Sequence, residues 1–135
     1  MHTRDLVVDE FEKMARLIAK LLGLKTAGST KQFEQEFNNI LQSEYDIELE
    51  KLLSLSEQDF ITSINTAQYG SEKLNALSQM LYVFAEPFKP DDDTQLLLKK
   101  VLAIFDLLEK KHHIQSFDNL NKRNAIYRYF NMNYE

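Results

Sequence analysis

Glu109 and His112 are the first residues whose types and spacing could support chemistry. The spacing Glu-x-x-His is that of helices holding a carboxylate-bridged pair of metal ions. Such a site needs a second Glu-x-x-His pair and two further glutamates on facing helices. Beyond the adjacent His113, the only other histidine is His2, so the second half cannot be built. We therefore predict no metal site, and interpret both residues as polar side chains near a helix C-terminus, where the dipole favours them.

The three consecutive carboxylates of 91–93 form a second candidate. A calcium loop needs alternating oxygen ligands, a glycine at the turn and a distal glutamate. That pattern is missing here, whereas acidic residues directly before an apolar helix cap its first turn and complement its dipole. We predict that the triplet caps a helix.

Nucleophilic and nucleotide chemistry have no recognisable motif in this chain. It lacks cysteine, its serines occur in helix-cap contexts, and no Gly-x-Ser-x-Gly, Gly-x-Gly-x-x-Gly or Gly-x-x-x-x-Gly-Lys occurs. We therefore predict no cofactor, no catalytic residue and no enzyme activity. The alternative is a small enzyme whose site is assembled from scattered Glu, Lys, Tyr and Arg side chains that only a structure could bring together.

The last forty residues combine aromatic and basic side chains, which is the composition of a protein-interaction patch or of a surface that stacks on bases. We expect Phe117, Leu120, Tyr127, Phe130 and Tyr134 to share one helix face, and Tyr129 to point elsewhere. Such aromatics are more often core residues. If they are exposed, the candidate partner surface consists of Arg123, Tyr127, Arg128, Tyr129 and Tyr134.

Composition and charge describe a globular chain with an acidic balance. Of its 135 residues 44% are hydrophobic and 27% are charged, and the net charge is −5. Residues 1–95 hold 9 Lys/Arg against 17 Asp/Glu, whereas residues 96–135 hold 7 against 4. The overall acidity makes nucleic acid an unfavourable partner. Apolar runs such as Val101–Phe105 are too short for a membrane helix, and acidic residues interrupt the N-terminus, so we expect a cytoplasmic protein.

The segment 92–111 must form the helix that positions the rest, because it is the longest strongly apolar segment without Gly or Pro. Its apolar face comprises Leu97, Leu98, Val101, Ile104, Phe105 and Leu108, and Leu96, Leu102 and Leu107 widen it. The polar strip of this helix is narrow and comprises Lys99, Ala103, Asp106 and Lys110. We predict a central helix covered by neighbours on most of its circumference.

Other helices are predicted on both sides of this segment. The first carries Val7, Phe11, Met14, Ile18 and Leu21 on one stripe, and Gly23 is expected to end it. Two further helices are expected to begin with a capping box, one at Ser29 with Gln32 and one at Ser56 with Asp59. The last helix is expected to begin at Ser116. Between them, 46–53 forms a short helix or a compact turn. Gly70 with Ser71 starts another helix, which ends near Pro87.

These six to seven helices predict a single all-α domain over 1–135, either an irregular bundle or stacked antiparallel hairpins at 56–87 and 92–133. Residues 7–25 (Val-Val-Asp-Glu-Phe-Glu-Lys-Met-Ala-Arg-Leu-Ile-Ala-Lys-Leu-Leu-Gly-Leu-Lys) resemble the start of a family of small bacterial helical proteins of unknown function. Residues 52–61 (Leu-Leu-Ser-Leu-Ser-Glu-Gln-Asp-Phe-Ile) and 114–118 (Ile-Gln-Ser-Phe-Asp) are also similar to it. The resemblance implies hairpins like those of tetratricopeptide proteins, and no activity.

Two hypotheses about function follow. The first is a noncatalytic interaction or scaffold module that holds a peptide or another protein in a groove between helical hairpins. The second is the small enzyme described above. A homodimer remains open under either hypothesis.

Overall fold

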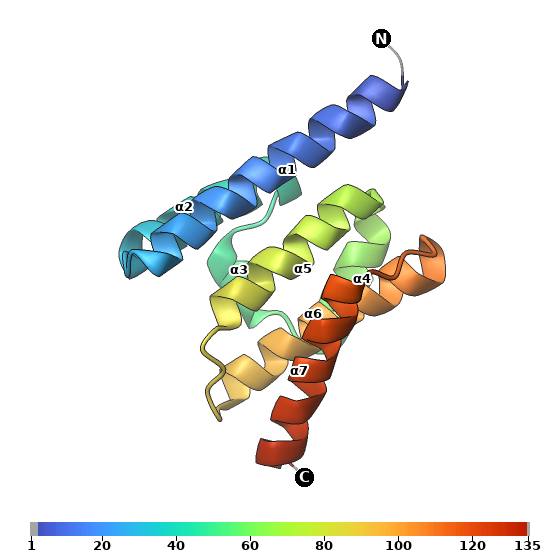
Figure 1. Ribbon diagram of the computed structural model, residues 1–135. Coiled ribbons are helices and arrows are strands. Elements are labelled where there is room, and N and C mark those ends of the chain that lie inside the picture. Colours follow the sequence, from blue (N-terminus) through green and yellow to red (C-terminus); the bar gives the residue numbers. More distant parts are fainter. Residues whose placement is uncertain (1–2, 135) are drawn as a thin grey trace. The chain divides into compact units, whose positions relative to one another are not determined.

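The computed structural model describes residues 3–134, and describes side chains from residue 9 to residue 133. This part of the chain is all-α, without a strand, which confirms the predicted fold class. The helices are α1 (Thr3–Thr26), α2 (Thr30–Tyr45), α3 (Leu49–Ser54), α4 (Glu57–Ala67), α5 (Ser71–Ala85), α6 (Asp92–Lys111) and α7 (Phe117–Tyr134) (Figure 1). None of them, over the described residues, has the length and apolar character needed to cross a membrane.

The chain divides into two compact units, Met1–Leu55 with α1 to α3 and Ser56–Glu135 with α4 to α7. The single domain over 1–135 and the stacking of hairpins therefore stay predictions.

In the first unit, α1 and α2 run antiparallel. Lys13 on α1 forms an ion pair with Glu44 near the end of α2 (2.8 Å), and Lys20 forms one with Glu36 further back (3.3 Å). The stripe predicted on α1 is buried at Met14 and Leu21. The buried residues of α2 are Phe33, Phe37, Ile40, Leu41 and Tyr45. Phe11 remains 65% exposed, so the stripe is buried only in part, and the side chain of Val7 lies outside the described residues.

The predicted end of α1 at Gly23 is wrong, because the helix continues to Thr26. Gly28, with φ +76°, is the left-handed glycine that follows it. The Gly28 N–H donates to the Lys25 carbonyl and the Ser29 N–H to the Leu24 carbonyl, both at 3.1 Å, which is the double turn typical of a helix ending in glycine. Both glycines could supply that conformation, but Gly23 stays helical.

The capping box predicted at Ser29 is also wrong, because its side chain makes no capping hydrogen bond. Its backbone, at φ −84° and ψ 68°, belongs to the turn that ends α1 and lacks the extended conformation of a usual N-cap. The uncertain segment 46–53 does contain a short helix, α3, which buries Leu49 and Leu52. The side-chain oxygen of Asn38 on α2 accepts a hydrogen bond from the Leu49 N–H (2.8 Å).

In the second unit, α6 packs against α4, α5 and α7, and its bounds are those predicted. The whole predicted face is buried, namely Leu97, Leu98, Val101, Ile104, Phe105 and Leu108. Asp91 caps the helix, since its Oδ1 accepts the Thr94 N–H at 2.8 Å. Hydrogen bonds from the backbone N–H and from the side chain of Thr94 lower the pKa of Asp91. The interpretation of the acidic triplet as a helix cap is therefore confirmed at Asp91.

The other predicted boundaries of this unit are confirmed as well. The Ser56 Oγ accepts the Asp59 N–H (3.1 Å) at the start of α4, and the Ser116 Oγ accepts the Asn119 N–H (3.0 Å) at the start of α7. Gly70 precedes α5, which ends at Ala85, two residues before Pro87.

Phe105→Ala is expected to lower the free energy of unfolding by about 3–5 kcal/mol, because it removes a ring that is 2% exposed and leaves a cavity. The matched control is Phe117→Ala, which truncates a ring that is 87% exposed and should change stability by less than about 0.5 kcal/mol. Urea denaturation of both variants measures the difference. Equal midpoints for the two would show that Phe105 is not part of the core.

Candidate functional site

Helix α7 exposes large apolar side chains on the side that faces away from the rest of its unit. We define the outer face of α7 as eight of its exposed residues, Phe117, Leu120, Asn121, Asn124, Tyr127, Arg128, Asn131 and Met132; Asp118 and Asn133 of the same helix are exposed as well. Phe117 is 87% and Met132 78% exposed. The opposite side buries Asn119, Ile126 and Tyr129. The interpretation of the shared face as core is therefore wrong for Phe117 and Tyr127, whereas Tyr129, which we expected to point elsewhere, is buried.

The five candidate surface residues do not form one surface. Tyr127 and Arg128 are exposed, and Arg128 makes no ion pair among the described residues. Arg123 is half-buried and bound by other side chains. Tyr129 is only 6% exposed, which removes it from the candidate surface. The side chain of Tyr134 lies outside the described residues.

Arg123 connects α7 to α6. Its guanidinium donates to Asp106 Oδ1 (3.2 Å) and Glu109 Oε1 (3.1 Å), and it lies 5.7 Å from the centre of the Phe105 ring. It also donates to the Tyr127 hydroxyl at 3.1 Å. Burial alone would lower the pKa of Arg123, but Tyr127 and the two carboxylates outweigh it, so the pKa is raised. Both carboxylates are thus bound by a cation that stays charged.

Tyr129 attaches α7 to the loop between α5 and α6. Its hydroxyl donates to the Lys89 carbonyl at 2.7 Å, and its ring meets Phe88 edge-on at 5.7 Å between centroids. Phe88 in turn packs edge-on against Tyr82 of α5, at 5.3 Å. A buried tyrosine with a bonded hydroxyl has a structural role.

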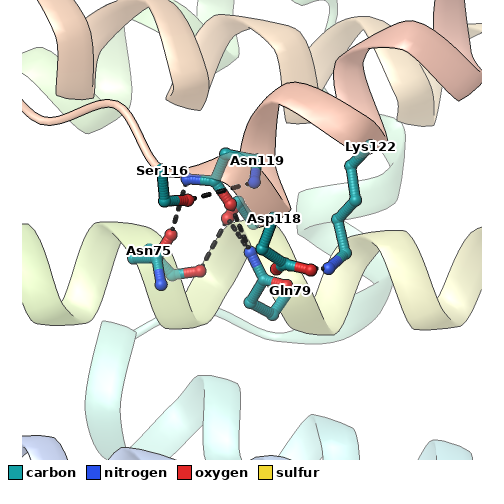
Figure 2. Close-up of polar contacts among 7 residues, drawn as sticks. Asn75, Gln79, Ser116, Asp118, Asn119 and Lys122 are labelled. Carbon is teal, nitrogen blue, oxygen red and sulfur yellow. Dashed lines mark hydrogen bonds and ion pairs between the residues drawn. The ribbon is translucent and has the colours of Figure 1, made fainter.

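A cluster of amide side chains joins α5 to α7 (Figure 2). Asn119 accepts a hydrogen bond from Gln79 Nε2 and donates one to Asn75 Oδ1, both at 2.9 Å. Gln79 Nε2 also donates to the Ser78 hydroxyl (3.2 Å), which itself donates to the Asn75 carbonyl (2.6 Å). Neutral amides neither take up nor release protons near neutral pH, so the cluster orients helices and cannot act as acid or base.

Sequence reasoning missed this amide cluster. The signal available was the pair Asn75 and Gln79, which are four residues apart on α5 and therefore share one side of an otherwise apolar helix. Their partner Asn119 is forty residues further on, and nothing in the sequence indicates that pairing.

Lys100 is the second feature that sequence reasoning missed. Its side chain belongs to α6 and is 0% exposed, and its Nζ lies 5.9 Å from the centre of the Phe60 ring on α4. Burial lowers the pKa of Lys100 to about 8. An amine with a lowered pKa is a possible nucleophile. Because no surface of this side chain is accessible, however, a substrate carbonyl has no route to it in this structure.

The residues considered for metal binding have other structural roles. Glu109 binds Arg123, Asp91 caps α6, and His112 follows the last turn of α6. The buried Nε2 of His112 has no hydrogen-bond partner among the described residues. Over that part of the chain, no group of three or more His, Cys, Asp or Glu side chains has an arrangement that could hold a metal ion.

Searches with this chain found no matching family model, no matching curated protein and no matching solved structure. The resemblance to small bacterial helical proteins with tetratricopeptide-like hairpins therefore stays a prediction.

Asn119→Ala is expected to lower the free energy of unfolding by about 1–3 kcal/mol, because it leaves the amides of Asn75 and Gln79 without their partner. Asn121→Ala, two residues further along α7 and exposed, should change stability by less than about 0.5 kcal/mol. Thermal or urea denaturation compares the two. A loss of the same size in both variants would mean that the amide cluster contributes nothing specific.

Lys100 predicts a pH-dependent stability. Its pKa is lower in the folded chain (about 8) than the usual 10.5, so the unfolded chain binds more protons between these values and stability rises with pH there. Lys100→Met has no amine at this position, so its stability lacks this pH dependence. At pH 7 the variant should therefore be more stable than the parent. This difference in the free energy of unfolding should shrink by an amount on the order of 3 kcal/mol between pH 7 and pH 10.5.

Urea denaturation at both pH values measures this difference. The matched control at pH 7 is Lys111→Met, which removes an exposed ammonium of the same helix and should change stability by less than about 1 kcal/mol. A pH-independent difference between Lys100→Met and the parent would contradict the burial of the ammonium.

Proposed function

We propose that this protein is a noncatalytic interaction module that binds another polypeptide chain through the outer face of α7. The observation that carries the proposal is the exposure of four large apolar side chains, Phe117, Leu120, Tyr127 and Met132, on one helix. Single exposed apolar residues are normal on protein surfaces, whereas a group of them on one element is typical of a contact surface.

The chemistry of the outer face also fits a protein partner. Aromatic residues, methionine and arginine are enriched in protein interfaces, and lysine and carboxylates are depleted. The outer face has this composition, with Arg128 and asparagines between the apolar side chains, and the exposed carboxylate nearest to it on α7 is Asp118. A helical module that offers such a face resembles the predicted scaffold, with the contact on one helix in place of a groove between hairpins.

The structure supports the alternatives less well. The enzyme hypothesis needs reactive side chains that a substrate can reach, but Arg123 holds Asp106 and Glu109, and Lys100 is buried. A nucleic-acid surface needs several free cations. On α7, Lys122 pairs with Asp118 and Arg123 with its two carboxylates, which leaves Arg128.

The test is photo-crosslinking in cells of the source organism. A photoreactive benzophenone amino acid placed at Tyr127 should give protein adducts on irradiation, whereas the same residue at Gln58, exposed on α4, should not. Adding Phe117→Asp should remove the adducts at position 127 without changing the helical circular dichroism. No adduct at position 127, or the same adducts at both positions, would contradict the proposal.

A further inference from the structure

The outer face of α7 has similar side chains at similar distances on either side of Asn124. Phe117 lies seven residues before it and Met132 eight after it, and both are strongly exposed. Leu120 lies four residues before it and Tyr127 three after it, and both are exposed as well. A face with this symmetry presents the same apolar pattern when a second copy is turned end for end.

Two charged residues of opposite sign lie on either side of Asn124 at unequal distances, and the acidic one also pairs with Lys122 of its own helix. Asp118, whose side chain is 65% exposed, lies six residues before Asn124, and Arg128 lies four residues after it. Two α7 helices side by side in antiparallel direction place Arg128 of each copy near Asp118 of the other, and their helix dipoles oppose each other favourably. A parallel pair would place like charges together, which is unfavourable.

Asn124 itself suits the centre of such a pair. A side-chain amide carries both donors and an acceptor, so it can bond to the same amide of a second copy across a two-fold axis. An asparagine within an apolar helix contact is also a known means of selecting one register, and of the three asparagines on this face Asn124 is the central one.

We infer that the partner of this surface is a second copy of the chain, bound with the two α7 helices antiparallel about a two-fold axis at Asn124. This inference rests on the proposed function and names its partner. From Phe117 to Met132 the contact is about 22 Å long. One helix pair lies at the small end of specific interfaces, so we expect a dissociation constant on the order of 10 μM.

Disulfide trapping tests the geometry, and the chain contains no cysteine that could interfere. Asn124→Cys should form a covalent dimer under mild oxidation, because the two copies of residue 124 meet at the axis. Asn131→Cys is the matched control, with the same exposed residue type on the same face. In the antiparallel pair its two copies are about 21 Å apart along the helix axes, whereas a disulfide needs Cα atoms within about 7 Å.

The outcomes are distinct. Trapping at position 124 alone supports the inference, trapping at both positions shows a parallel pair and overturns it, and trapping at neither position overturns it as well. Sedimentation velocity gives the second measurement. The parent should become dimeric toward about 100 μM, and Phe117→Asp should weaken dimerisation at least tenfold. Phe11→Asp, which changes an exposed phenylalanine of α1, should leave dimerisation unchanged.

This inference and the proposed function can fail separately. A chain that stays monomeric, but whose position 127 crosslinks to other proteins, overturns the second copy as partner and retains the interaction module. A monomeric chain without adducts at position 127 overturns both.

Discussion

The unit Ser56–Glu135 depends on the burial of one wide apolar face of α6. Leu98, Val101 and Ile104 have no accessible surface, and three helices, α4, α5 and α7, pack around them. A face this wide cannot be covered by one neighbour, so the other helices of the unit must gather around α6. The same requirement buries Lys100, which lies among apolar side chains on α6, and its ammonium must tolerate an environment that disfavours its charge.

Helix α7 is held to its unit in a different way. Its inner side contributes one fully buried aliphatic residue, Ile126, the buried ring of Tyr129 and several polar groups. Arg123 binds two carboxylates of α6, Asn119 bonds to amides of α5, and Tyr129 bonds to the loop before α6. Such directional contacts specify register more than they contribute free energy. These contacts leave Phe117, Leu120, Tyr127 and Met132 pointing outward. These four side chains form the surface that we propose as the interaction site.

The parts predicted correctly depend on neighbouring residues. The N-terminal caps at Ser56, Asp91 and Ser116 each join a side chain to a backbone N–H three residues on, and such pairs are visible in the sequence. The end of α1 was mistaken because Gly23 and Gly28 offer the same local signal. The candidate site was predicted only in part, since Tyr127 and Arg128 are exposed whereas Tyr129 is buried.

The sequence by itself determined that the chain is helical, where α6 begins and ends, and which apolar face of α6 is buried, because helical periodicity and capping act over a few residues. Only the tertiary structure decided which side of α7 faces inward. Apolar residues occur all round that helix, so its own pattern cannot select a side. Helix α7 is oriented by its hydrogen bonds to Asn75, Gln79, Asp106 and Glu109. The positions of these four residues opposite α7 result from the packing of α5 and α6.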